Sequence, residues 1–247
     1  MQKPVLVTAS LPFELASFTS LLRKQSEVIP GRKNLLSGVL GVGDNSQNVV
    51  VLFTGIGGPI AKKSLLEALS YVFPKLVLIS GTAGALNIQS KVGDIIVDCT
   101  QGSKTLRDQV LKTAGEAARP GFKVWHKPLH TANQVVTGFG NKTQVGQLTK
   151  AFAVDMESSD LAQTLNEKGI EHVVVRVISD GLHDNFPIPF KKYIKANGYP
   201  SITQLTGHLL VHPWKIPGVI LLGRQFHAKC SGFGYILKEI IEKTVDL

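Results

Sequence analysis

Three acidic residues each come shortly after a short segment with the composition of a buried strand. They are Glu14, Glu157 and Asp180. In open α/β sheets, ligands bind in the crevice outside the carboxyl ends of the strands, so we expect the three carboxylates to meet in one pocket. There they would donate or accept protons and hydrogen bonds. A carboxylate at a strand end can instead stabilise the start of the next helix, and Asp155 is a candidate for this second role.

The elements that must position these acids alternate along the chain in the rhythm of an α/β domain. Strands are predicted at 3–8, 48–53, 75–80, 95–98, 134–137, 152–154 and 172–178. Helices are predicted at 12–24, 61–71 and 155–168, with a closing amphipathic helix after Gly234. The polar stretch 100–123 fits neither pattern. The last predicted strand is apolar apart from Arg176, which is typical of a strand covered on both faces.

Length and charge limit the class of protein. The chain has 247 residues, which we interpret as a single domain, 1–247, with a divergent extension at 186–247 that is rich in Pro, Gly and aromatic residues. It carries 27 Lys and Arg against 18 Asp and Glu, a net charge of +9. The positive residues are dispersed rather than clustered in a long run, so no nucleic-acid partner is predicted.

Cysteine usage and hydropathy point to a protein of the cytoplasm. Cys99 and Cys230 are far apart and lack the spacing of a disulfide framework or a zinc site. We expect neither a metal nor a cofactor. The apolar runs are much shorter than the roughly 18 to 20 residues of a membrane-spanning helix. The start of the chain also lacks the pattern of a cleaved secretory signal.

Four segments resemble the signature segments of one family, which contains the methylthioadenosine/S-adenosylhomocysteine nucleosidases and the purine and uridine nucleoside phosphorylases. In chain order they are 54–57, 80–86 with 92–97, 152–158 and 173–180. A short glycine motif is weak evidence, whereas four ordered segments are specific. The resemblance implies a three-layer α/β/α fold with a mixed, twisted central sheet, and a reaction that cleaves the N-glycosidic bond of a nucleoside.

The chemistry of that reaction fits the three acids. Breaking the bond between ribose and base passes through an oxocarbenium-like cation, which requires a proton donor, negative charge near the sugar and a positioned nucleophile. By similarity to the family, Asp180 is the general acid for the base, Glu157 accepts hydrogen bonds from the ribose hydroxyls, and Glu14 orients the attacking water.

Other residues of these segments are expected to line the substrate pocket. They are Thr82, Ala83, Gly84, Phe139, Met156, Arg176 and Ser179. Phe139 ends a segment that resembles the adenine-recognition segment of the family and would stack on the base. Met156 would form an apolar wall under the sugar or fill the core. Arg176 would contact substrate or pair with a carboxylate such as Glu157, because an unpaired buried guanidinium is costly.

The attacking group is predicted to be water, with phosphate as the alternative. Ile79 stands where bacterial purine phosphorylases carry a phosphate-binding arginine. A phosphorylase would instead have to bind phosphate at Gly55 and Gly57, at the start of a helix, with help from Arg32. A further alternative is a nucleoside-binding protein without catalytic activity.

The segment 212–224 resembles the tail of the hopanoid-associated nucleosidases, which are thought to remove adenine from adenosylhopane. An apolar extension that contains Trp214 in a basic protein would suit an amphiphilic substrate at an anionic membrane surface. It would equally suit a subunit interface. The expected partners are therefore a small nucleoside with water or phosphate, and a second copy of the chain or a membrane surface.

Overall fold

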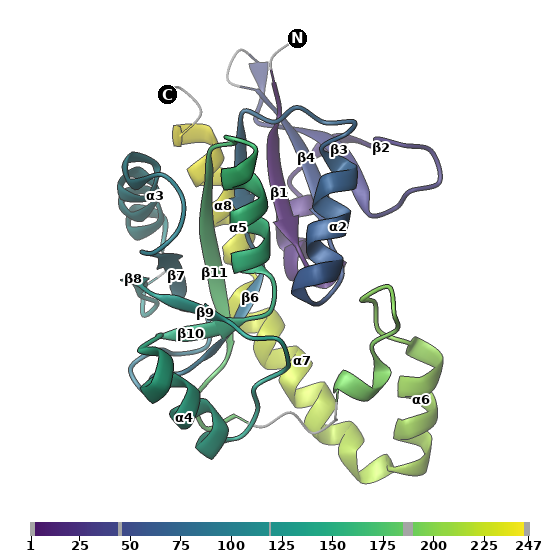
Figure 1. Ribbon diagram of the computed structural model, residues 1–247. Coiled ribbons are helices and arrows are strands. Elements are labelled where there is room, and N and C mark those ends of the chain that lie inside the picture. The colour runs from purple at the N-terminus through teal and green to yellow at the C-terminus, as the bar shows by residue number, and fades with distance from the viewer. Residues whose placement is uncertain (1–2, 44–45, 119, 185–189, 245–247) are drawn as a thin grey trace.

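The computed structural model describes residues 3–43, 46–118, 120–184 and 190–244. Within these residues, eleven strands form one sheet in the order β2-β3-β4-β1-β5-β11-β6-β10-β9, while β7 pairs with β11 and β8 (Figure 1). The strands are β1 Val5–Ala9, β2 Arg23–Glu27, β3 Leu35–Leu40, β4 Gln47–Phe53, β5 Leu76–Ile79, β6 Thr82–Ala85, β7 Ile95–Asp98, β8 Val124–Lys127, β9 Leu129–Thr131, β10 Ala153–Asp155 and β11 His172–Asp180.

The sheet is mixed, and its centre is parallel. Strand β1 pairs in parallel with β4 and β5, and β11 pairs in parallel with β5 and β6. Antiparallel pairs join β3 to β2 and β4, β6 to β10, and β7 to β11. Because β11 is nine residues long and contacts β5, β6 and β7, it links the two halves of the sheet.

Helices cover both faces of the sheet. They are α1 Ala16–Thr19, α2 Gly58–Ala68, α3 Lys104–Ala117, α4 Phe139–Thr149, α5 Ser158–Glu167, α6 Ile202–Val211, α7 Ile216–Cys230 and α8 Phe233–Thr244, with 3-10 turns at Pro12–Leu15, Phe190–Tyr193 and Pro213–Lys215. Helices α1, α3 and α8 share one core with the sheet, and α2 and α5 share the other. The predicted three-layer α/β/α fold is confirmed.

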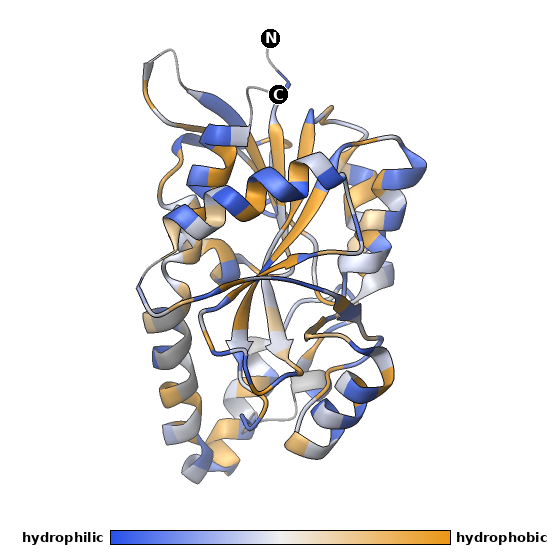
Figure 2. Cartoon of the chain, turned by 90° about the vertical axis from the view of Figure 1, so that its left-hand side faces the viewer, coloured by the Kyte–Doolittle hydropathy of each residue, from blue (hydrophilic) through white to orange (hydrophobic). Residues whose placement is uncertain are grey.

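Successive side chains of each strand point to opposite faces of the sheet and so contribute to the two cores in turn. In β1, Val5 and Val7 pack on the side of α8, whereas Leu6 between them packs on the side of α2 and α5. Both faces of the central strands are therefore apolar, as expected when helices cover a largely parallel sheet. Figure 2 shows these hydrophobic strands enclosed by helices that carry both hydrophilic and hydrophobic residues.

The C-terminal helices behave differently from one another. Helix α8 packs against α3 and α1 and buries Phe233, Leu237 and Ile240 in the core. Helix α7 touches β11, but α6 lies away from the sheet (Figure 1). Among the helices in the described ranges, none is both long enough and apolar enough to cross a membrane.

Several predicted elements were wrong or missing. The helix predicted at 12–24 ends at Thr19, and the chain continues as β2 because 23–27 pairs with the edge of β3. The segment 134–137 is not a strand but part of the loop between β9 and α4. The unassigned stretch 100–123 contains α3, whose narrow buried stripe of Leu106, Val110 and Ala114 leaves most of the helix polar.

Candidate active site

Strand β6 brings two of the predicted acids to one side of the sheet. Its residues Thr82 and Gly84 are partly exposed, whereas the side chains of Ala83 and Ala85 are buried in the core. Residues two apart on a strand share a face and lie about 7 Å apart. Because Glu14 binds Thr82 and Asp180 lies beside Gly84, both carboxylates lie on this face.

Glu14 is held rigidly at the end of β1. It lies in the 3-10 turn Pro12–Leu15, and its Oε1 accepts hydrogen bonds from the backbone N–H of Thr82 at 3.0 Å and from Thr82 Oγ1 at 2.5 Å. Its Oε2 accepts a hydrogen bond from the backbone N–H of Leu11 at 2.8 Å. The carboxylate is buried and has a single orientation, as a group that positions another molecule requires.

Glu157 lies at the N-terminus of α5, between the sheet and the loop that follows β4. Its Oε1 accepts a hydrogen bond from the backbone N–H of Gly57 at 2.8 Å. Burial, followed by repulsion from Asp155, raises the pKa of Glu157 to about 7, although Arg176 and the N–H of Gly57 act in the opposite direction. Near neutral pH this carboxyl is therefore poised between its two charge states.

Arg176 is a structural residue in this arrangement. Its Nη2 lies 2.6 Å from Asp155 Oδ2 and 3.9 Å from Glu157 Oε2, and its Nη1 donates to the carbonyl of Ser80 at 2.8 Å. Ser158 Oγ accepts from its Nε and Nη2. The guanidinium is buried and fully paired, so the predicted ion pair is present, with Asp155 as its closer partner. Direct contact of Arg176 with substrate is not supported.

Asp180, at the end of β11, carries a contact that was not predicted. Its Oδ1 accepts a hydrogen bond from Ser179 Oγ at 2.6 Å, and its Oδ2 lies 2.5 Å from the Nζ of Lys142 in α4. Gly84 leaves the room for this carboxylate, because a Cβ there would lie 3.0 Å from Asp180 Oδ2.

Lys142 was not predicted as a site residue, because a lysine in a polar helix is usually exposed. Here its side chain is buried, although α4 has no other buried residue. The available signal was the composition of α4, which lacks an apolar stripe and therefore needed another reason to pack against the sheet.

The remaining predicted pocket residues divide into two groups. Met156 and Ser179 are partly exposed beside the carboxylates, and the half-exposed Phe139 stacks on His183 at a ring distance of 4.6 Å. Ala83, by contrast, points into the core and offers only its carbonyl, which accepts a hydrogen bond from Ser179 Oγ. A pocket role for the side chain of Ala83 is not supported.

The candidate phosphate groups are not gathered into an anion site. The backbone N–H of Gly55 donates to Ser10, and that of Gly57 donates to Glu157. Arg32 forms an ion pair with Glu67 of α2, and Ile79 is buried in the core. In the part of the chain that the structure describes, no cluster of three or more His, Cys, Asp or Glu side chains could hold a metal ion.

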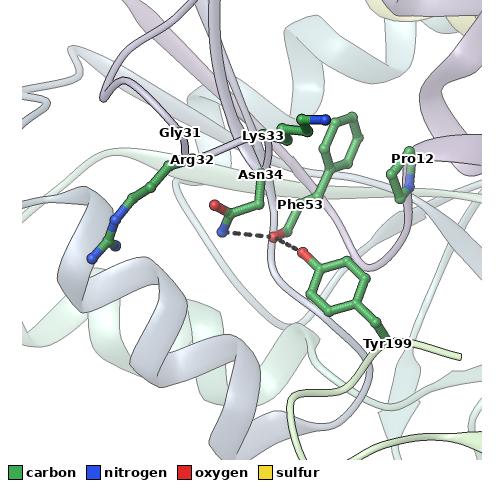
Figure 3. A pocket seen from close by; sticks show the side chains of 7 residues that line it. All are labelled: Pro12, Gly31, Arg32, Lys33, Asn34, Phe53 and Tyr199. Atoms are coloured by element: carbon green, nitrogen blue, oxygen red, sulfur yellow. Dashed lines mark hydrogen bonds between the residues drawn. The ribbon is translucent and has the colours of Figure 1, made fainter. Parts of the chain in front are cut away.

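A pocket of about 460 Å³ adjoins this site (Figure 3). It is lined by Pro12, Gly31, Arg32, Lys33, Asn34, Phe53 and Tyr199. Tyr199 Oη donates a hydrogen bond to the carbonyl of Phe53 at 2.7 Å, and Asn34 Nδ2 donates to the same carbonyl at 3.4 Å. The three carboxylates do not line this pocket, but Pro12, which does, begins the turn that carries Glu14.

Comparison with known proteins gives consistent matches. Residues 4–100 match the model of the Phosphorylase superfamily. The 5′-methylthioadenosine/S-adenosylhomocysteine nucleosidase of Staphylococcus haemolyticus is 26% identical over 211 residues, which cover 76% of this chain and 91% of the relative. The enzyme of the same name from a Shewanella species is 25% identical, covering 63% of this chain and 76% of the relative.

These matches support the resemblance to the phosphorylase superfamily that the four sequence segments indicated. Solved structures of similar fold align with nearly the whole chain. The Neisseria meningitidis nucleosidase of the same name, in complex with methylthio-immucillin-A, has a TM-score of 0.70 at 15% identity and covers 98% of this chain and 100% of its own. The Campylobacter jejuni nucleosidase has a TM-score of 0.69 at 13% identity with the same coverage. The resemblance of 212–224 to hopanoid-associated nucleosidases stays a prediction.

Proposed function

We propose that this protein is a nucleosidase of the phosphorylase superfamily, which hydrolyses the N-glycosidic bond of an adenosine-like nucleoside. The observation that carries the proposal is the placement of Glu14 and Asp180 on one face of β6, with Glu157 held beside the loop at Gly57. The names of the two relatives, both methylthioadenosine/S-adenosylhomocysteine nucleosidases, support the same activity.

Each carboxylate has a task in this reaction. As the bond from C1′ of ribose to the base breaks, its electron pair leaves with the base, which takes up a proton at the Asp180 side of the site. Glu157 accepts hydrogen bonds from the ribose hydroxyls and stabilises the sugar cation. A water held by Glu14 then adds to C1′ and gives its proton to that carboxylate. Phe139 and Met156 provide apolar contacts to base and sugar.

Hydrolysis is favoured over phosphorolysis by the state of the candidate anion donors. The N–H groups of Gly55 and Gly57 already donate to protein oxygens, and Arg32 is paired with Glu67. A phosphate would have to displace these partners, and no arginine replaces Ile79. Water needs only the acceptor that Glu14 provides.

The test is base release from adenosine, methylthioadenosine, S-adenosylhomocysteine and inosine, each with and without phosphate. We expect release without phosphate and a free sugar product. Strict dependence on phosphate, with a ribose 1-phosphate product, would favour the phosphorylase alternative. In the variant Asp180→Asn we expect base release to fall by about 10²- to 10⁴-fold while nucleoside binding is retained. Binding without release by the unmodified protein would indicate a nucleoside-binding protein.

We also propose that 1–247 acts as a single domain in which 186–247 is an extension with two roles. Helix α8 completes the core against α3 and α1. Helices α6 and α7 and the 3-10 turn between them expose a set of apolar side chains, namely Leu210, Val211, Trp214, Ile220 and Leu221. The sequence from 185 to 238 contains seven Lys or Arg and no Asp or Glu. This combination suits peripheral binding to an anionic membrane surface.

Vesicle sedimentation tests the membrane proposal. We expect the protein to sediment with vesicles that contain phosphatidylserine, not with neutral vesicles, and to be released by salt. Trp214→Ala should weaken this binding, whereas Phe73→Ala, which removes an exposed aromatic ring elsewhere, should not. Equal binding to neutral vesicles would contradict an electrostatic contribution, and no binding to either would reject the proposal.

We propose further that the protein works in the cytoplasm as a homo-oligomer. Cys99 and Cys230 are not joined by a disulfide, as is usual for proteins of a reducing compartment. The exposed apolar residues of α6 and α7 would be the shared surface if a second copy rather than a membrane covers them. Light scattering in solution distinguishes a monomer from an oligomer, and cell fractionation tests the compartment.

A further inference from the structure

Lys142 is buried against Asp180, the residue assigned above to the base side of the site. Its side chain has no exposed surface, and its Nζ lies 2.5 Å from Asp180 Oδ2. Burying an ion pair is weak evidence for stability, because apolar residues of similar volume often serve the fold as well or better. A buried lysine at this position therefore needs a reason beyond packing.

The ammonium group acts on the carboxylate and on nothing that enters the site. Its three acceptors are Asp180 Oδ2, the carbonyl of Gly181 at 2.6 Å and the carbonyl of Asp184 at 3.4 Å. An ammonium has three N–H donors, so none remains for a substrate in this arrangement. Lys142 is accordingly a positioning residue that works through Asp180 rather than a catalytic residue.

The contacts of Asp180 are those of an ionised carboxylate. One oxygen accepts from Lys142 Nζ and the other from Ser179 Oγ. A neighbouring positive charge and donated hydrogen bonds both favour the charged form of a carboxyl group. A general acid must hold a proton, however, and an ionised carboxylate has none to give.

We propose that Lys142 supplies the proton that Asp180 delivers to the leaving base. The Nζ–H bond breaks as an O–H bond forms on Asp180, and this proton passes to a ring nitrogen of the base as the bond to C1′ breaks. Lysine ends as a neutral amine, Asp180 ends as a carboxylate, and the base ends protonated. After the base leaves, a proton from solvent reaches Asp180 through the emptied site and passes from Asp180 back to Lys142. The inference rests on the proposed nucleosidase function and extends it to the source of the proton.

The geometry of α4 supports a link to the base. Phe139 and Lys142 are three residues apart on this helix, so both side chains lie on the same face, toward the loop at 181–184. The ring proposed to stack on the base and the lysine proposed to supply its proton thus belong to one rigid element.

The test compares leaving groups that do and do not require a proton. Lys142→Met removes the ammonium at nearly the same length, and the substrates are an adenosine-like nucleoside and 4-nitrophenyl riboside, whose nitrophenolate leaves unprotonated. A nucleoside methylated at N7, which leaves without further protonation, is the second proton-independent probe. We expect the variant to lose about 10²-fold or more on the unmethylated nucleoside and only a few-fold on the other two.

Lys142→Arg separates proton supply from charge. Arginine keeps a positive charge beside Asp180 but does not release a proton in proteins. We expect it to be as slow as Lys142→Met on the unmethylated nucleoside, while cleavage of the proton-independent substrates shows that its site is intact. Restored cleavage of the unmethylated nucleoside would overturn the proton role in favour of a purely electrostatic one.

The remaining outcomes separate this inference from the proposed function. An equal loss on all three substrates would mean that Lys142 only maintains the site, and the inference would fail while the nucleosidase function stood. An unmodified protein that cleaves none of the three substrates, with or without phosphate, would overturn the proposed function and the inference together.

Discussion

The carboxylates proposed for the sugar side and the base side of the candidate site have different hydrogen-bond and ion-pair partners. Glu157 accepts a hydrogen bond from the backbone N–H of Gly57, and the guanidinium of Arg176 stays 3.9 Å away. Asp180 instead has the ammonium of Lys142 at 2.5 Å. Both acids are buried, so the position of the nearby cation, rather than burial, distinguishes their surroundings.

This difference has a chemical consequence. On the sugar side, the guanidinium of Arg176 is paired with Asp155, and the pKa of Glu157 is raised to about 7. On the base side, the cation contacts the acid directly, and in the proposed mechanism it supplies the proton. Two buried acids of the same type therefore acquire separate tasks through their partners.

Removing the cation of the sugar side should have the largest effect on the fold. Arg176→Met would leave Asp155 buried and without its ion-pair partner, and we expect a loss of about 3–5 kcal/mol in the free energy of unfolding. Urea denaturation measures it. Arg32→Met, which breaks the exposed pair with Glu67, is the control and should cost less than about 1 kcal/mol. Similar losses for both would refute a structural role for Arg176.

Replacing the proposed base of the reaction should affect rate more than stability. Glu14→Gln keeps the shape of the side chain but cannot accept a proton from water, and we expect kcat/KM to fall by about 10²- to 10³-fold. Steady-state kinetics on the preferred nucleoside measures the loss. Glu116→Gln, which alters an exposed carboxylate paired with Lys243, should leave the rate unchanged. A normal rate for Glu14→Gln would remove Glu14 from the mechanism.

The pH dependence should follow Glu157. Its pKa is raised from 4.5 to about 7, chiefly by burial, and the charged form is the one proposed to grip ribose. We expect kcat/KM to rise about tenfold per pH unit below pH 7 and to level off above it. A profile that is flat between pH 5 and 8 on a substrate whose leaving group needs no proton would contradict this assignment.

The same shift predicts a change in stability. Because the folded state holds this proton more tightly than the unfolded state, the stabilisation is complete below about pH 4.5 and is lost as pH rises through about 7. The variant Glu157→Gln has no carboxyl group at this position, so its free energy of unfolding does not include this pH-dependent loss. Relative to the unmodified protein, it should therefore gain on the order of 3 kcal/mol between pH 4.5 and 8 in urea denaturation. No relative gain would mean that Glu157 is ionised in the folded state throughout this range.

The smallest effect is expected at Phe139. Its half-exposed ring stacks only on His183 among the ring contacts of the described residues, so Phe139→Ala should change stability by about 1 kcal/mol or less. If the ring stacks on the base, KM should rise several-fold with little change in kcat. A fall in kcat alone would instead link Phe139 to the placement of Lys142 on the same helix face.

The fold class and the three acids could be predicted because both depend on patterns of residue type within short segments of the sequence. Apolar runs of strand length alternate with helical segments, and four ordered segments carry Glu157, Asp180 and their neighbours. The predicted mixed sheet between two helix layers is confirmed. The predicted roles of the site residues stay predictions until they are tested by substitution.

Other features depended on which distant segments pack together. The chain at 23–27 is a strand because β3 lies beside it, although the helix predicted at 12–24 extended into its start. The local preference for a helix is weak. Pairing with β3 outweighs it, because the strand satisfies backbone N–H and C=O groups that would otherwise be unpaired. The segment 134–137, wrongly predicted as a strand, instead forms part of the loop that leads from β9 into α4.

The sequence by itself determined which residues carry charge, which segments are apolar, and which family the four segments resemble. Only the tertiary structure decided the partners of the charges. Lys142 and Asp180 are 38 residues apart, and Gly57 and Glu157 are 100 apart. Residue type reveals that a buried charge needs a partner, but the choice among many candidates follows from the packing of helices on the sheet.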